Sequence, residues 1–159
     1  MECPRRRNVR IPGFDYRTPG AYFLTVCTAN REKLLWSDGR GDLRSPANVP
    51  LSPIGVIVEK EIQKLNTVYK AVRVEKYCIM PDHIHLILSI HSEENGQPMV
   101  APTISRVMQQ FKGSVTKQAG RSIWQKSFYD HGIRNQQDYD AIWQYIENNP
   151  LKYTLKKAP

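Results

Sequence analysis

The sequence of 159 residues lacks the features that mark several special classes of protein. It contains no low-complexity tract and no repeat at a fixed period, which excludes a repeat architecture. No stretch reaches the roughly 18 consecutive apolar residues that span a bilayer. The basic N-terminus is followed by IPGFDYRTPG rather than by the apolar core of a signal peptide. We therefore expect a single domain over residues 1–159, cytoplasmic and without a membrane segment.

Cysteine is also scarce. The chain has only Cys3, Cys27 and Cys78, and no two of them are spaced as Cys-x-x-Cys. The absence of Cys-x-x-Cys spacing excludes a zinc ribbon and a dithiol redox motif. An odd number of scattered cysteines fits a protein of a reducing compartment.

Acidic residues are outnumbered by basic ones. The chain has 15 Asp and Glu against 23 Lys and Arg, for a net charge of +8 and a pI of about 9.5. This balance favours a polyanionic partner. Part of the charge lies in a predicted basic arm over residues 1–12, where four arginines could neutralise phosphates: Arg5, Arg6, Arg7 and Arg10. Taken alone, the cluster is explained equally well as a solvated tail.

The remaining sequence alternates between two kinds of apolar spacing. Runs rich in β-branched and aromatic residues predict strands over 21–29, 71–80 and 83–90 and a short strand within 122–134, with residues 32–36 as a candidate partner of the first. Residues 37–50 and 92–102 are rich in turn-forming residues. The first stretch is predicted to be a long loop or to contain a short hairpin, and the second to be a surface loop.

Helical spacing predicts three helices. The first is capped by Ser52 and covers 53–70, and the second runs from 104 to near Gly120. The last covers 137–149, with Asp138 as its cap and its end before Pro150. This order of elements predicts an α+β fold, a ferredoxin-like split βαβ sandwich of antiparallel sheet and helices, with an added C-terminal helix.

Two of the four histidines lie two residues apart in the segment PDHIHLIL, residues 81–88. Side chains of a strand alternate between its faces, so His83 and His85 share one face while Ile84 and Leu86 share the other. The apolar face can be buried while the two imidazoles bind a cation together. Two ligands are too few to hold a metal, and an isolated pair is more often two core histidines whose nitrogens bond backbone groups.

The C-terminal helix could supply the missing groups. Tyr145 and Asn149 are four residues apart, which places a phenol and an amide on the same helical face. The alternative interpretation of Tyr145 is a core aromatic on the apolar stripe of this helix. Spacing also leaves three rival nucleophiles open: Tyr129, Tyr139 and Tyr153.

Three blocks of the sequence resemble a known family. YCIMPDHIHLIL resembles the HUH motif, His-hydrophobic-His, of the single-tyrosine transposases that act on single-stranded DNA. FYDHGIRNQQDYDAIWQYIENNPLKY resembles the C-terminal block of REP-associated tyrosine transposases, and RRRNVRIPGFDYRTPGAYFLTVCTANRE is similar to the opening strand of the same branch. Together the blocks cover well over half of the chain.

The resemblance implies a mechanism and a set of site residues. It implies that His83, His85 and Asn149 bind a divalent ion, Mg²⁺ or Mn²⁺, although related insertion-sequence transposases often have glutamine at the last position. It further implies that Tyr145 cleaves and rejoins DNA at hairpin sequences through a 5′-phosphotyrosine. We also expect DNA contacts from His131, Arg134 and Lys112.

Two other functions remain open at this stage. A non-catalytic nucleic-acid-binding protein could keep the fold and the basic surface of such a transposase. A hydrolase could use the His-x-His metal site with water as its nucleophile. The family resemblance also leaves open a monomer or a homodimer that exchanges tyrosine helices.

Overall fold

The computed structural model describes residues 20–37, 50–91, 93–94, 97–98 and 102–157. The elements in chain order are β1 (Gly20–Cys27), the 3-10 turn η1 (Ala29–Arg31), α1 (Pro53–Val68), β2 (Val72–Ile79), β3 (His83–Ile90), β4 (Glu93–Glu94), β5 (Gln97–Pro98), α2 (Ile104–Ala119), β6 (Tyr129–Gly132) and α3 (Gln136–Lys157). No helix in these ranges is long and apolar enough to cross a bilayer.

Four strands form one antiparallel sheet in the order β2-β3-β1-β6. Since β1 and β2 both run antiparallel to β3, they are parallel to each other, and α1 connects them around the inserted β3. This arrangement is the split βαβ unit, so the predicted α+β fold class is confirmed.

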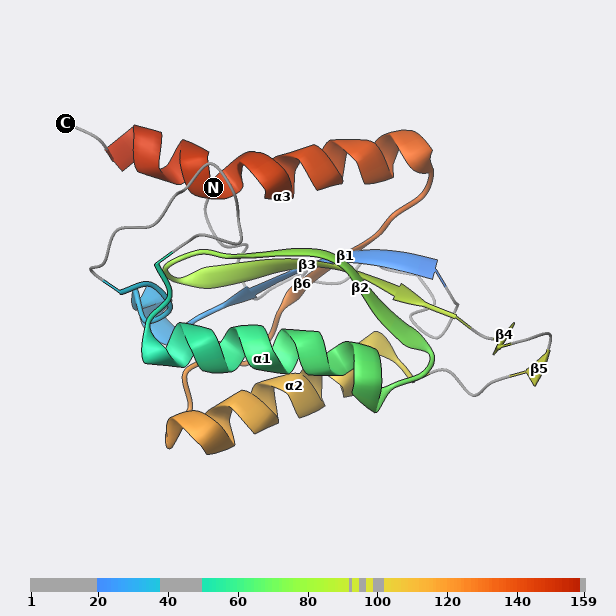
Figure 1. The fold of residues 1–159 in the computed structure, drawn as a ribbon, viewed down its shortest axis with the longest axis horizontal. Coiled ribbons are helices and arrows are strands. Elements are labelled where there is room, and N and C mark those ends of the chain that lie inside the picture. The colour runs from blue at the N-terminus through green and yellow to red at the C-terminus, as the bar shows by residue number, and fades with distance from the viewer. Residues whose placement is uncertain (1–19, 38–49, 92, 95–96, 99–101, 158–159) are drawn as a thin grey trace.

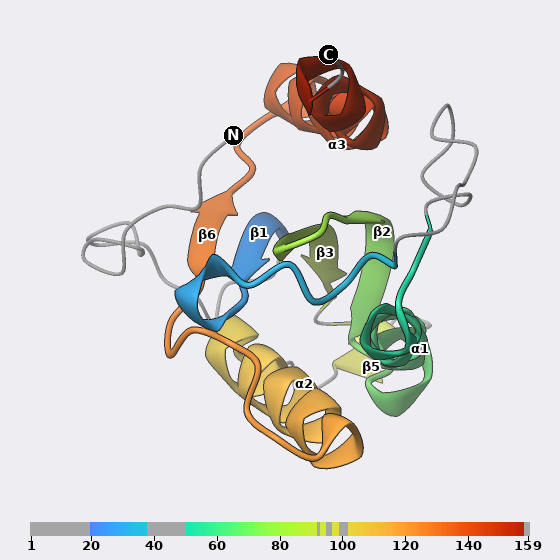
Figure 2. The same cartoon turned by 90° about the vertical axis from the view of Figure 1, so that its left-hand side faces the viewer.

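The sheet is covered by helices on both faces. Helices α1 and α2 pack on one face and α3 lies across the other (Figures 1 and 2). The larger core lies under α1 and α2, where Leu24, Ile84, Leu86, Ile62 and Phe111 meet. A smaller cluster under α3 contains Phe23, Cys78, Met80, Ile87 and Ile146. The strands in the middle of the sheet therefore bury apolar side chains on both sides.

The first two helices begin as the sequence predicts, and α2 also ends as predicted, whereas α1 ends at Val68 rather than at residue 70. The Ser52 side chain accepts a hydrogen bond from the Gly55 backbone N–H at 3.0 Å, and Pro53 occupies the first helical position of α1. Helix α2 ends at Gly120, whose φ of 80° is a left-handed conformation that glycine adopts without strain.

Two predictions about local pairing are wrong. Residues 32–36 do not pair with β1, because β3 and β6 already occupy its two edges. Trp36 instead forms a bridge with Leu51, and its indole Nε1 donates to the Ile79 carbonyl at 2.7 Å. Within the predicted loop 92–102, the described residues of β4 and β5 form a short antiparallel ladder.

The prediction for the last helix is wrong at both ends. Its cap is Asn135, whose side chain accepts from the Asp138 backbone N–H at 2.8 Å, while Asp138 lies inside the first turn. The helix also continues through Pro150 to Lys157. An interior proline costs about 3 kcal/mol, and burial of Pro150 against the rest of the protein shows that packing outweighs the local preference.

Candidate active site

The two histidines of β3 lie on the face of the sheet that α3 covers. His83 and His85 are buried, with ring centroids 4.8 Å apart, while Ile84 and Leu86 point into the core under α1 and α2. The division of β3 between two faces therefore agrees with the alternation of the sequence. Phe23 of β1 stacks on His85 at 5.3 Å and limits the movement of its ring.

Both imidazoles use Nδ1 for a hydrogen bond and leave Nε2 without one. His83 Nδ1 lies 2.7 Å from an Asp82 carboxylate oxygen, and His85 Nδ1 lies 2.9 Å from the Thr25 hydroxyl. The Nε2 atoms of both rings are buried and have no hydrogen-bond partner in the described ranges. Unpaired buried nitrogens are costly, which makes a missing ligand a natural explanation.

Helix α3 brings the predicted tyrosine and amide to this pair. The Tyr145 ring centroid lies 5.4 Å from that of His85, and Tyr145 also meets Phe23 edge-on at 6.3 Å. Asn149 is buried one turn further along and forms a hydrogen bond with Tyr145. Its Nδ2 atom has no partner in the part of the chain that the structure describes. The four residues thus meet within one chain.

The donor atoms of His83, His85 and Asn149 are of the kinds that bind divalent cations. Imidazole nitrogens and an amide oxygen are accepted ligands of borderline and hard divalent ions. The described residues contain no group of three His, Cys, Asp or Glu that could hold a metal. A third protein ligand beside His83 and His85 would therefore be Asn149, with its amide oxygen turned toward the histidines.

Burial controls the protonation of the site. It raises the pKa of Tyr145, as does the neighbouring Cys78, whereas the hydrogen bond with Asn149 acts in the opposite direction. Burial and the charge of His83 hold the pKa of His85 well below its usual range. His85 is therefore neutral near pH 7, which is the form that can bind a metal.

The rival tyrosines lie farther from the histidines or face other groups. Tyr129 pairs with Thr25 on β1, so a whole strand separates it from His85, about 10 Å at the usual spacing of strands. Tyr139 packs on Trp143 with centroids 5.9 Å apart. Tyr153 lies where α3 has no described side chains.

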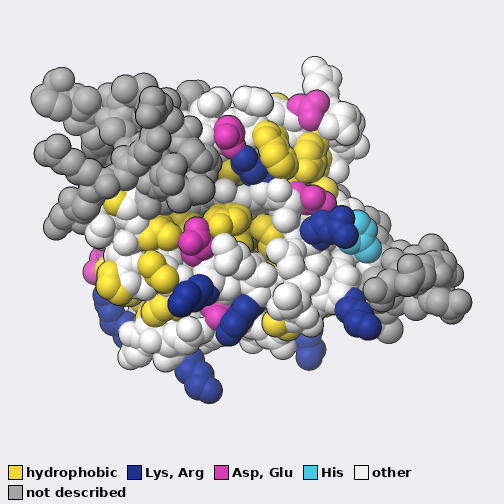
Figure 3. Space-filling view, in the orientation of Figure 1, with side chains coloured by type: hydrophobic (Ala, Val, Ile, Leu, Met, Phe, Trp, Pro, Cys, Tyr) yellow, Lys and Arg dark blue, Asp and Glu magenta, His cyan; other side chains and the backbone are white. Residues whose placement is uncertain are grey.

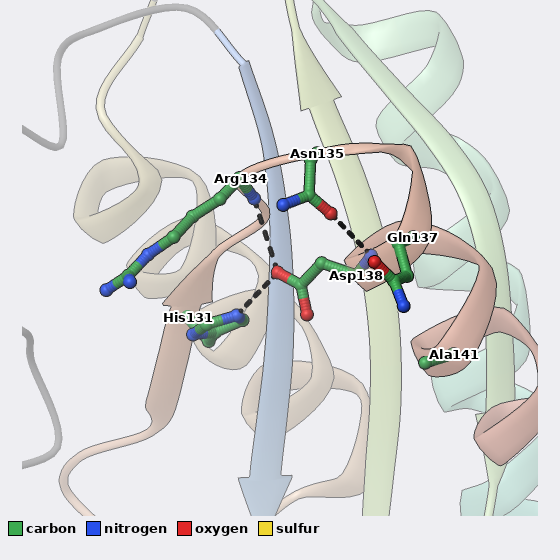
Figure 4. A pocket seen from close by; sticks show the side chains of 6 residues that line it. All are labelled: His131, Arg134, Asn135, Gln137, Asp138 and Ala141. Carbon is green, nitrogen blue, oxygen red and sulfur yellow. Dashed lines mark hydrogen bonds and ion pairs between the residues drawn. The ribbon is translucent and has the colours of Figure 1, made fainter.

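Two predicted DNA-binding residues line a separate pocket where β6 leads into α3 (Figure 4). His131 Nε2 lies 2.9 Å from Asp138 Oδ2, which also accepts from the Arg134 backbone N–H at 3.2 Å. The pocket has a volume of about 440 Å³. The Arg134 side chain is exposed and points away from Asp138 in Figure 4.

The other predicted DNA contacts are not brought to this site. Lys112 lies on α2, on the opposite face of the sheet, and its ammonium donates to the Gln125 carbonyl at 2.6 Å. Further exposed cations lie on the same layer, including Lys60, Lys64 and Lys117, and Figure 3 shows basic side chains dispersed over this part of the surface. Arg5, Arg6, Arg7 and Arg10 lie outside the described residues.

Sequence reasoning missed the residues that bond the two histidines. Asp82 directly precedes His83, so its proximity was a usable signal. Thr25 is sixty positions from His85 and becomes its neighbour only through the register of β1 against β3. Arg31 was missed in the same way and bonds Asp82 across fifty-one positions.

Comparison with known proteins places this chain in a family. Residues 57–149, more than half of the chain, match the family model described as Transposase IS200 like. An uncharacterised protein of Haemophilus influenzae strain Rd is 29% identical over an alignment of 165 positions, and the alignment covers 92% of this chain and 88% of that protein. A second protein of that strain, provisionally named a REP-associated tyrosine transposase, is 24% identical over 152 residues, covering 87% and 74%.

A solved structure shares the fold. It is a REP-associated tyrosine transposase bound to a REP hairpin, 23% identical, and the match covers 91% of this chain and 74% of that one with a TM-score of 0.64. The resemblance first seen in the sequence is thus confirmed by a family model, by named relatives and by fold. On the match of residues 57–149, the chain belongs to the family of IS200-like transposases.

Proposed function

We propose that this protein cleaves and rejoins single-stranded DNA at hairpin sequences, with Tyr145 as its nucleophile. The observation that carries the proposal is the approach of Tyr145 on α3 to His85 on β3 within one chain, at 5.4 Å between ring centroids. Membership of the transposase family supports DNA as the substrate. The solved relative bound to a REP hairpin supports hairpin DNA in particular.

His83, His85 and Asn149 would hold the divalent ion, Mg²⁺ or Mn²⁺. When bound there, the ion would polarise the scissile phosphate and offset the charge that develops on it. Because the pKa of Tyr145 lies above its ordinary value, the phenol is protonated in the resting protein. Tyr145 therefore has to lose its proton as it attacks.

The reaction is a transesterification in which each bond formed replaces one broken. The Tyr145 oxygen bonds to phosphorus while the bond from phosphorus to the 3′ oxygen breaks. The phenolic proton leaves, and the 3′ oxygen takes up a proton to become a hydroxyl. A 3′-hydroxyl can later attack the phosphotyrosine, which rejoins a strand and restores the phenol without an external energy source.

The pocket at the start of α3 would contact the same DNA strand. Asp138 precedes Tyr145 by seven residues, which corresponds to about 10 Å along a helix. A strand whose scissile phosphate lies at Tyr145 can therefore reach His131 and Arg134 with neighbouring nucleotides. The net charge of +8 would strengthen such binding through release of counterions.

The test is formation of a covalent adduct. A labelled single-stranded hairpin oligonucleotide is incubated with the full chain and Mg²⁺ or Mn²⁺, and a denaturant-resistant protein–DNA product is sought on a gel. We expect the adduct with the wild type and none with Tyr145→Phe. Tyr139→Phe is the matched control, since it removes a phenol from the same helix away from the histidines, and it should form the adduct normally.

Other outcomes would favour the alternative functions. Hairpin binding that survives Tyr145→Phe, with no cleavage by the wild type, would mark a non-catalytic DNA-binding protein. Metal-dependent cleavage without any adduct would mark a hydrolase that uses water. An adduct that persists in Tyr145→Phe would overturn the choice of nucleophile alone.

A further inference from the structure

We propose that Asp82, held in place by Arg31, is a positioning residue that orients His83 so that its Nε2 faces the metal site. This inference rests on the metal site of the proposed function and adds two residues to it. Asp82 and Arg31 touch neither DNA nor metal in this assignment. They act through the imidazole of His83.

The three side chains form a chain of hydrogen bonds. Arg31 Nε lies 3.1 Å and its terminal nitrogen 3.0 Å from Asp82 Oδ2. The other carboxylate oxygen, Oδ1, lies 2.7 Å from His83 Nδ1. Each oxygen of Asp82 therefore has a different partner, and the carboxylate is clamped between them.

The clamp determines which nitrogen of His83 is available. A carboxylate can only accept, so Nδ1 donates to it, and in the metal-binding form of the ring the lone pair lies on Nε2. The Nε2 atom of His83 is buried and has no hydrogen-bond partner in the described ranges. A carboxylate on the second nitrogen of a metal-binding histidine also fixes the ring orientation and makes it a more basic ligand.

The backbone around Arg31 is shaped to hold this contact. Asn30 and Arg31 have φ angles of 56° and 54°, in the left-handed region that costs energy for residues other than glycine. The turn is tied to the connection between β2 and β3, because Thr28 N–H donates to the Asp82 carbonyl and Leu35 N–H to the Pro81 carbonyl, both at 3.0 Å. These bonds bring the guanidinium to a carboxylate on a distant segment.

Metal affinity measured without DNA tests the inference directly. Mn²⁺ binding to the full chain is followed by isothermal titration calorimetry. Removal of a group that orients a metal-binding histidine typically lowers affinity by about 10- to 100-fold, which is the loss expected for Asp82→Ala. Asp82→Asn should lose less, because its amide oxygen can still accept from Nδ1. Arg31→Gln should fall between the wild type and Asp82→Ala.

The matched control is Asp140→Ala, which removes one exposed carboxylate and changes the net charge equally. It should bind Mn²⁺ as the wild type does. Thermal melting of each variant separates positioning from folding, and Arg31→Gln keeps the test decisive if Asp82→Ala does not fold. A graded loss at unchanged melting temperature, partly restored in Asp82→Asn, is expected only for a positioning role.

The results separate this inference from the proposed function. Equal Mn²⁺ affinity for wild type, Asp82→Ala and Arg31→Gln, with an adduct formed by the wild type, would overturn the inference alone. The graded loss of affinity with no adduct on any hairpin would uphold it and overturn the transposase function. A wild type that binds no Mn²⁺ would overturn both the inference and the metal site.

Discussion

Single residues in this protein serve the core and the candidate site at once. Within β3, His85 and Ile84 are neighbours in sequence but face opposite layers. Tyr145 packs against the apolar cluster under α3 and also approaches His85. The core interpretation of Tyr145 and the catalytic one therefore do not exclude each other. A half-buried candidate nucleophile held by aromatic neighbours is well oriented, but its burial raises its pKa.

Cys78, buried under α3, gives a pH-dependent prediction at the scale of one residue. Burial raises the pKa of its thiol from 9.0 to about 12. The unfolded chain therefore releases this proton more easily than the folded protein, and stability falls as the pH rises from about 9 to about 12. The expected contribution is about 1.4 kcal/mol for each pH unit in that window.

Urea unfolding at several pH values between 7 and 11 measures this slope. Cys78→Ala should be less stable at pH 7, because it leaves a small cavity, but its free energy of unfolding should decline less steeply above pH 9. Parallel declines for the wild type and Cys78→Ala would contradict the assignment of this alkaline loss to Cys78.

At the scale of elements, the described side chains form a smaller apolar cluster under α3 than under α1 and α2. Among the residues whose burial the structure describes, the cluster under α3 has five buried members and the cluster on the other face has twenty. Polar contacts supplement the attachment. Lys76 of β2 forms an ion pair with Glu147 and lies over the Trp143 ring, 4.6 Å from its centroid. Over residues 136–150, attachment of the tyrosine helix therefore depends on a few described side chains.

Lys76→Met should loosen α3 while leaving α1 and α2 unchanged. The substitution keeps the apolar stem but removes the charge that Glu147 and Trp143 contact. Since the ion pair is partly exposed, the two contacts are worth about 1 kcal/mol together. Hydrogen exchange across residues 136–149 should then speed up about fivefold.

Lys60→Met provides the control for this measurement, because Lys60 is an exposed lysine of α1 on the opposite layer. It should leave exchange in α3 at the wild-type rate. Acceleration of the same size in both variants would mean that loss of a positive charge, rather than release of α3, is responsible.

At the scale of the whole molecule, the sheet separates a structural layer from a functional one. Helices α1 and α2 close the main core, and α3 completes the candidate site on the other face (Figure 2). All four site residues meet within one chain. A monomer with this arrangement needs no exchanged helix from a second copy.

Mixing two inactive variants tests this arrangement. Tyr145→Phe lacks the proposed nucleophile and His85→Ala lacks a proposed metal ligand, so neither should form an adduct alone. If each chain uses its own tyrosine, an equimolar mixture should also form none. Adduct in the mixture, on the His85→Ala chain, would instead show that tyrosine helices are exchanged between copies.

Much of the fold could be predicted because periodicity is local. Period-two alternation placed His83 and His85 on one face of β3, and helical spacing placed Tyr145 and Asn149 together on α3. The errors arose where distant segments compete with local preference. Pro150 was expected to end α3, and residues 32–36 were expected to pair with β1, but packing and occupied strand edges decided otherwise.

The sequence by itself determined which side chains share a face of a strand or helix, since that depends only on residues a few positions apart. It also carried the three blocks that identify the family. Only the tertiary structure decided that the His83 and His85 pair meets Tyr145. It also decided that Thr25 bonds His85, and that Arg31 bonds the Asp82 carboxylate that holds His83. Those contacts depend on strand register, on the turn at Arg31 and on how α3 packs, which are set by the whole chain together.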